Sequence, residues 1–120
     1  MKLRILNNSI RLRVSQSEVD QFEQTGKVSG RTDFGNQSLV YTLAIKEGIS
    51  KIDSSFENNE IIIFVPTSEA KAWLNPENVG FRNEEGSDLK ILVEKDFQCL
   101  HKRPDEDESD SFPNPQAIQN

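Results

Sequence analysis

The chain has 120 residues, of which 34% are apolar and 28% charged, and its net charge is −6. This length predicts one domain with a single hydrophobic core. The negative net charge argues against general affinity for nucleic acid or an anionic membrane surface, because both require a basic protein surface. A single cysteine excludes an intrachain disulfide, and no apolar run reaches the length of a signal peptide or a membrane span. We therefore expect a soluble, cytoplasmic protein.

A segment of sixteen residues occurs twice in the chain. Residues 7–22 return as residues 58–73 at a constant offset of 51, with six identical positions and with Phe22 matched by Trp73. Chance pairing would give about one identity, so the pattern indicates an internal duplication. We expect Phe22 and Trp73 to occupy equivalent positions in the core.

The chain begins with a predicted hairpin. Residues 2–5 read K-L-R-I and residues 10–14 read I-R-L-R-V, so apolar and basic side chains alternate. Alternation with a period of two is typical of a strand with one buried face. The Asn7-Asn8 pair between the two segments favours the positive φ of a tight turn.

A helix and three strands should complete the first copy. Ser15 and Glu18 form a capping-box pattern, and Gly26 supplies a C-terminal stop, so we predict a helix over about residues 17–25. Three strands, separated by turn-forming residues, are then predicted at residues 27–34, 38–46 and 49–57.

The second copy repeats this order with two differences. Pro66 replaces Ser15, so the side chain of Thr67 or Ser68 should cap the second helix, which ends before Pro76. The last strand matches its counterpart one residue out of register with the offset of 51, so one residue is deleted in the preceding turn. Strands are predicted at residues 60–65, 79–83 and 89–94.

These elements predict an α+β fold built from a duplicated β-α-β-β-β unit. Residues 1–100 would form a single domain with repeats at residues 7–57 and 58–100, and residues 1–6 would supply the strand that the second unit lacks. Eight strands and two short helices would then form an antiparallel sheet or a closed barrel, which removes exposed edges. Two packed four-stranded sheets are the alternative. Residues 101–120 would form an acidic C-terminal tail.

The duplicated topology resembles that of the triphosphate tunnel (CYTH-like) enzymes, whose eight-stranded antiparallel barrel holds a phosphate chain and a metal. This resemblance implies polyphosphate binding or phosphate-ester hydrolysis in a tunnel-type barrel. Those enzymes carry E-x-E-x-K on their first strand, whereas residues 2–5 of this chain read K-L-R-I, so the hydrolytic motif is absent here.

Three segments of the chain resemble a family of small bacterial proteins of unknown function. They are N-S-I-R-L-R at residues 8–13, V-E-K-D-F-x-C-L at residues 93–100 and F-P-N-P at residues 112–115. The resemblance covers nearly the whole chain and implies that the acidic tail belongs to the protein. It implies no activity.

Basic side chains on the predicted strands are candidates for an anion-binding site. If the strands that carry them are neighbours, five of these side chains share one sheet face: Lys2, Arg4, Arg11, Arg13 and Lys90. Guanidinium groups pair bidentately with phosphate or carboxylate, so this cluster would suit a small anionic ligand. The alternative is a solvated strand face whose charges are balanced by surface acids.

The second copy differs from the first on the same strand face. It has Ile62 and Phe64 where the first copy has Arg11 and Arg13. Large apolar side chains on an outward face should be covered. A helix, the C-terminal tail or a second subunit are the candidates, and a cover from within the monomer is the favoured prediction.

Residues of metal-binding types lie where the tail begins. The candidate ligands of a divalent metal are Cys99, His101, Asp105 and Asp107. A solvated acidic tail is the alternative. Nothing identifies an orienting group or oxyanion donors for Cys99 and His101, so no catalytic residue is assigned and enzymatic activity stays open.

The absence of a recognisable catalytic set favours a small soluble binding or accessory protein. Its partner would be a protein or a small anionic ligand, without nucleic acid or membrane, and the chain would be a monomer or a homodimer. Anion or polyphosphate binding, or phosphate-ester hydrolysis, is the alternative function.

The tail is predicted to dock on the body through residues 112–115. Two prolines reduce the entropy lost when this segment becomes ordered, and Phe112 offers a large apolar ring. The acids between Asp105 and Asp110 would then pass basic groups such as Lys2, Arg4 or Arg11.

Overall fold

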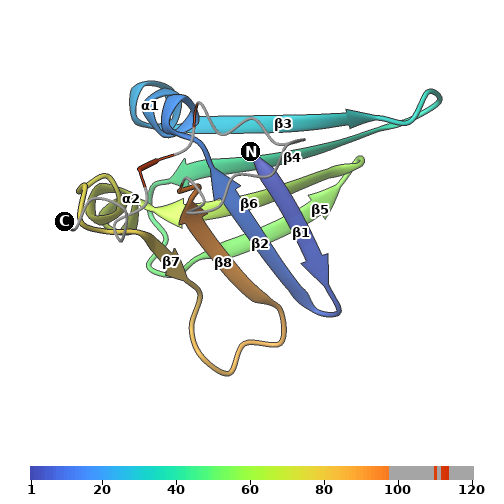
Figure 1. The fold of residues 1–120 in the computed structure, drawn as a ribbon. Coiled ribbons are helices and arrows are strands. Elements are labelled where there is room, and N and C mark those ends of the chain that lie inside the picture. Colours follow the sequence, from blue (N-terminus) through green and yellow to red (C-terminus); the bar gives the residue numbers. More distant parts are fainter. Residues whose placement is uncertain (98–109, 111, 114–120) are drawn as a thin grey trace.

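Eight strands and two helices make up the described part of the computed structural model, which covers residues 1–97, 110, 112 and 113 (Figure 1). The first five elements are β1 (Lys2–Leu6), β2 (Ser9–Val14), α1 (Gln16–Thr25), β3 (Lys27–Asp33) and β4 (Ser38–Lys46). The other five are β5 (Asp53–Glu57), β6 (Glu60–Pro66), α2 (Thr67–Trp73), β7 (Gly80–Arg82) and β8 (Lys90–Lys95).

The strands form two four-stranded sheets. Sheet A has the order β1-β2-β8-β7, and sheet B has the order β3-β4-β6-β5. In each sheet the two outer pairs are antiparallel, while the central pair, β2-β8 or β4-β6, is parallel. The prediction of one antiparallel sheet or a closed barrel is therefore wrong. The alternative of two four-stranded sheets is correct.

The two helices are the connections between the sheets. The chain passes through α1 from β2 of sheet A to β3 of sheet B, and through α2 from β6 of sheet B to β7 of sheet A. Each helix therefore carries the chain across to the other sheet. As a result, the inner strands of hairpins from different halves of the chain meet and run in the same direction.

The two sheets have the same pairing pattern. Ile10 lies opposite Ile91 in sheet A, and Ile61 lies opposite Tyr41 in sheet B. The residue numbers of Ile10 and Ile61 differ by 51, and those of Tyr41 and Ile91 differ by 50. Residues that pair in sheet A therefore correspond to residues that pair in sheet B. The offset between them is 51 in the repeated segment and 50 in the last strand, as expected if one residue is deleted in the turn before that strand.

The inner faces of both sheets enclose one hydrophobic core, with the strands of the two sheets crossing at an angle and both helices at one end (Figure 1). Fully buried strand residues come from both sheets: Leu12, Val14 and Val93 from sheet A, and Val28, Leu43, Ile63 and Val65 from sheet B. Phe22 of α1 and Trp73 of α2 are also fully buried, with their ring centroids 5.6 Å apart. The two aromatic residues therefore meet in the core at the helix end of the molecule.

The helix starts confirm one of two capping predictions. The Ser15 N–H donates to Glu18 Oε1 over 3.0 Å at the start of α1. The start of α2 has no side-chain cap, so the predicted cap by Thr67 or Ser68 is wrong. The physical reason is that Pro66, the last residue of β6, occupies the cap position and has no side-chain oxygen.

Ile62 and Phe64 lie half-buried on the outer face of sheet B, and neither belongs to the core. Lys46 covers one side of Phe64, with its Nζ 4.7 Å from the ring centroid. The favoured prediction, a cover by a helix or the tail, is not met within the described residues.

Candidate anion-binding site

Rows of side chains cross the outer face of sheet A. The middle row, in register across the four strands, is Arg4, Arg11, Leu92 and Arg82. The row on one side is Lys2, Arg13, Glu94 and Gly80, and the row on the other side is Leu6, Ser9 and Lys90. One face of an acidic protein thus carries a concentration of basic side chains.

The alternation of apolar and basic residues puts these side chains on the outer face. In β2, Leu12 and Val14 are buried in the core, so Arg11 and Arg13 must point away from it. In β7, Phe81 is buried and its neighbour Arg82 is exposed on the same outer face. Short strands with one buried face therefore build the basic surface.

A cavity of about 570 Å³ opens on this face. Its basic lining residues are Arg4, Arg11, Arg82 and Lys90. Leu6 and Leu92 add apolar surface, and Glu84 and Glu85 line it from the loop between β7 and β8. We refer to this space, defined by its four basic residues, as the basic cavity.

Polar contacts hold the loop that forms one wall of the basic cavity. Asn83 Nδ2 donates to the Leu89 carbonyl over 2.7 Å, and Asn83 Oδ1 accepts from the Ile91 N–H over 3.0 Å. Glu84 pairs with Lys51 over 3.1 Å. This exposed ion pair adds little stability, but it weakens the repulsion between the wall and an anion in the cavity.

Acidic side chains balance the other end of the same face. Glu94 Oε1 lies 2.5 Å from Arg11 Nε and 3.8 Å from Arg13 Nε. Asp96 pairs with Lys2 over 3.0 Å. Lys2 and Arg13 are therefore matched by acids and do not line the basic cavity.

Three of the basic side chains that line the cavity are not paired with acids among the described residues, although Glu84 and Glu85 share its lining. Arg4, Arg82 and Lys90 have no ion-pair partner within the part of the chain that the structure describes. Arg4 also lies directly across the strand pair from Arg11, an arrangement in which like charges repel. Because Glu94 already neutralises Arg11, an anion in the cavity would meet mainly the charges of Arg4, Arg82 and Lys90.

The structure places three of the five sequence-predicted residues at the basic cavity, namely Arg4, Arg11 and Lys90. Sequence reasoning missed Arg82. The signal for it is the pair Phe81-Arg82, which repeats the alternation of a buried apolar residue with a basic residue seen in β1 and β2.

The predicted metal ligands Cys99, His101, Asp105 and Asp107 lie outside the described residues. Within residues 1–97, 110, 112 and 113, no group of three or more histidine, cysteine, aspartate or glutamate side chains is arranged to hold a metal ion.

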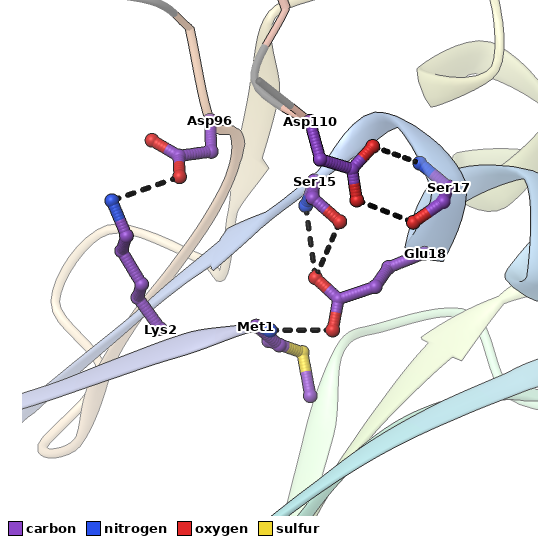
Figure 2. A network of polar contacts seen from close by, with 7 residues as sticks. All are labelled: Met1, Lys2, Ser15, Ser17, Glu18, Asp96 and Asp110. Carbon is purple, nitrogen blue, oxygen red and sulfur yellow. Dashed lines mark hydrogen bonds and ion pairs between the residues drawn. The ribbon is translucent and has the colours of Figure 1, made fainter. Parts of the chain in front are cut away.

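Asp110 caps the start of α1 (Figure 2). Its carboxylate accepts from the Ser17 N–H over 3.1 Å and from the Ser17 hydroxyl over 2.5 Å. Hydrogen bonds from the Ser17 hydroxyl and N–H hold the pKa of Asp110 below its ordinary value. Among the described residues Asp110 forms no ion pair with Lys2, Arg4 or Arg11, and Asp105 to Ser109 lie outside them. The N–H groups at a helix start attract a carboxylate in the same way as a basic side chain.

Phe112 docks on the body of the protein, as predicted. Its N–H donates to the Asp96 carbonyl over 2.6 Å, and its ring centroid lies 5.7 Å from that of Phe97. Lys95 Nζ lies 5.5 Å from the Phe112 ring and donates to the Asn75 carbonyl over 3.0 Å. Burial lowers the pKa of Lys95. The rest of the predicted docking segment, apart from Pro113, lies outside the described residues.

Two mixed sheets, two short helices and a basic cavity on one outer face define a small α+β protein. The chain belongs to a family of unknown function, DUF7009, whose model matches residues 1–116. This result confirms the unknown-function family indicated by the three sequence segments. No curated protein and no solved structure matches the chain significantly. No helix among the described residues is long and apolar enough to cross a membrane.

Proposed function

We propose that the protein is a small binding or accessory protein that holds an organic anion in the basic cavity. The observation that carries this proposal is the convergence of Arg4, Arg82 and Lys90 on one cavity without ion-pair partners among the described residues. Guanidinium groups bind carboxylate or phosphate bidentately, and two of these three side chains are arginines.

The shape of the site favours an elongated ligand with an apolar part. Arg4 and Arg82 lie on the two edge strands of sheet A, three strand spacings apart, which corresponds to roughly 14 Å between their backbones. Leu92 lies in the same row between them, and Leu6 also lines the cavity. Two separated anionic groups joined by an uncharged segment would match this arrangement better than a compact inorganic ion.

Titration with small anions tests the proposal. Dicarboxylates, mononucleotides, pyrophosphate and triphosphate are added in a thermal-shift screen, and the binding of each compound that raises the melting temperature is measured by calorimetry. A ligand at a hundred times its Kd stabilises the folded state by about 2.7 kcal/mol, which such a screen detects.

A matched pair of variants locates the binding. Arg82→Ala should weaken binding tenfold or more, whereas Arg13→Ala removes the same side chain from the same sheet face but outside the cavity, and should leave the affinity within about twofold. Equal losses in the two variants, or no stabilisation by any of these anions, would contradict the proposal.

We also infer that the chain arose by duplication of a β-α-β-β-β unit. The repeated segment and the common pairing pattern of the two sheets support this origin. A cytoplasmic, reducing setting fits the single cysteine, and a bacterial source fits the three family-like segments.

A further inference from the structure

The outer face of sheet B is arranged differently from that of sheet A. Its side chains also form rows across the four strands: Lys27, Ala44, Phe64 and Asp53; Ser29, Thr42, Ile62 and Ser55; Arg31, Val40, Glu60 and Glu57. The two inner strands, β4 and β6, therefore carry most of the apolar side chains, and the two edge strands carry polar and charged ones.

A strip of apolar side chains runs along the middle of this face. Val40, Ala44, Ile62 and Phe64 are half-buried, yet none of them belongs to the hydrophobic core or packs against it. Lys46 lies over Phe64 on one side. Strand faces that meet only water usually carry polar residues, so this strip has the composition of a surface that packs against something.

The charges at the two edges of the face have opposite signs. Lys27 and Arg31 lie on β3, whereas Asp53 and Glu57 lie on β5. All four are exposed, and none forms an ion pair within the described residues. The face is therefore basic along one edge and acidic along the other.

Of the other charged groups on the face, Lys46 lies over the Phe64 ring, and Glu60 and Asp33 have local polar partners. Glu60 accepts from Thr42 Oγ1 over 2.7 Å, and Asp33, at the end of β3, accepts from the Gly35 N–H over 3.0 Å and from Ser38 Oγ over 3.3 Å. Arg31 donates to Ser38 Oγ over 2.9 Å, and Asp53 accepts from the Ser54 N–H over 2.8 Å, but neither contact supplies an opposite charge. The basic pair on β3 and the acidic pair on β5 can therefore still form ion pairs with another molecule.

We propose that this face binds the same face of a second copy of the chain, in a symmetric dimer whose two-fold axis runs parallel to the strands. Such an axis keeps each row opposite the same row and exchanges the two edges. Lys27 then faces Asp53 of the partner subunit, and Arg31 faces Glu57 of the partner subunit. Between these pairs, Phe64 packs on Ala44 of the partner subunit and Ile62 on Thr42 of the partner subunit, while Val40 lies opposite Glu60 of the partner subunit.

The rows also select the direction of the axis. A two-fold axis perpendicular to the strands would place β3 against β3 of the second copy, so basic residues would face basic residues. Like charges across an interface oppose association, whereas the parallel axis satisfies both edges. The distribution of charge therefore favours one symmetric arrangement.

The area of the face predicts a weak dimer. Four strands at about 4.8 Å spacing and six or seven residues at about 3.3 Å each give roughly 400–500 Å² per copy. A standard stable interface buries about 800 Å² per partner. Association is therefore expected at high micromolar concentrations. It does not depend on the anion site, which lies on the outer face of the other sheet.

Sedimentation velocity from 10 μM to 1 mM at about 0.1 M salt tests whether the full chain dimerises. The wild-type chain should pass from monomer to dimer over this range, and added salt should weaken the association because the edge pairs are screened. A chain that stays monomeric at 1 mM would overturn the proposal.

Charge reversal at the two edges tests the arrangement. The double variants Lys27→Glu/Arg31→Glu and Asp53→Lys/Glu57→Lys should each be monomeric, because both edges of the face then carry one sign. An equimolar mixture of the two variants should dimerise again, because every basic edge meets an acidic edge. Self-association of either variant at the wild-type level, or a monomeric mixture, would overturn the arrangement.

Two further measurements separate folding defects from interface effects. The control Glu23→Lys/Glu77→Lys replaces two exposed acids by lysines, as Asp53→Lys/Glu57→Lys does, but at positions away from the face. This control should dimerise like the wild type.

Disulfide cross-linking tests the direction of the axis. In a Cys99→Ser background, a mixture of Ser29→Cys and Ser55→Cys chains should form disulfide-linked dimers at least fivefold faster than either chain alone, because the middle row places these two residues opposite each other. Equal rates would contradict the parallel axis.

Discussion

Trp73 closes the core at its helix end. Its indole contacts Phe22 and Phe81 edge to face, with centroid distances of 5.6 and 5.4 Å, and its Nε1 has no conventional acceptor among the described residues. A buried N–H group without an acceptor adds no favourable hydrogen bond to the folded state. The contribution of Trp73 to stability therefore comes mainly from its packed volume.

Replacing Trp73 tests this interpretation. Trp73→Ala should lower the free energy of unfolding by about 3–5 kcal/mol, because the space left in the core cannot collapse completely. Trp73→Phe keeps the aromatic contacts and should cost less than half as much. Urea unfolding followed by circular dichroism measures both variants. An alanine variant that loses less than about 1 kcal/mol would show that the surrounding residues close the core without Trp73.

Glu18 links the start of α1 to the beginning of the chain (Figure 2). Burial alone would raise the pKa of Glu18. Hydrogen bonds from the Met1 ammonium group, the Ser15 N–H and the Ser15 hydroxyl outweigh that effect, so the pKa lies below its ordinary value. The ionised form of Glu18 is therefore favoured by folding.

This shift predicts a dependence of stability on acid pH. Because the pKa of Glu18 is lower in the folded than in the unfolded chain, its contribution is fully present above the unfolded value and is lost as the pH falls through the folded value. Between about pH 5 and 3, the melting temperature of the wild type should fall more steeply than that of Glu18→Gln. The exposed Asp20→Asn on the same helix is the control, and parallel curves for wild type and Glu18→Gln would contradict the prediction.

At the scale of the elements, residues after β8 connect the ends of both helices. Asp110 caps the start of α1 through Ser17. Phe112 packs over Lys95, whose ammonium group donates to the Asn75 carbonyl just beyond the end of α2. Carboxylates at helix starts and cations at helix ends both interact favourably with the helix dipole. The two contacts therefore stabilise the helix end of the core together.

Removing the ring of Phe112 should release this connection. We expect Phe112→Ala to lower the free energy of unfolding by about 1–3 kcal/mol, because a half-buried ring and its contact with Phe97 are lost. Phe34→Ala, at a phenylalanine that is 67% exposed, should change it by less than about 0.5 kcal/mol. Chemical unfolding measures both, and equal effects would show that Phe112 is not docked in solution.

At the scale of the whole molecule, the two sheets share a pairing pattern but differ on their outer faces. The outer face of sheet A carries the basic cavity, and the outer face of sheet B carries an apolar strip between oppositely charged edges. Since the core lies between the two inner faces, the outer faces point away from each other. One fold thus provides two separate surfaces for two kinds of contact.

Local signals in the sequence determined most of the elements. Asn7 and Asn58 have φ values of 50° and 52°, as expected for tight turns between strands. The capping pattern and Gly26 gave α1, with bounds that differ from the prediction by one residue. Strand alternation also gave the outward direction of Arg4, Arg11 and Lys90. These features depend on neighbours in the sequence, so a pattern of residue types is sufficient to predict them.

Only the tertiary structure decided which strands pair and which side chains meet. The parallel pairs β2-β8 and β4-β6 join the two halves of the chain, and a local pattern carries no information about such a choice. The same pairing brings Glu94 to Arg11, which is 83 residues away, and places Arg82 in the row of Arg4. The physical reason is that each helix carries the chain to the opposite sheet. The composition of both outer faces therefore depends on contacts between residues that are far apart in the sequence.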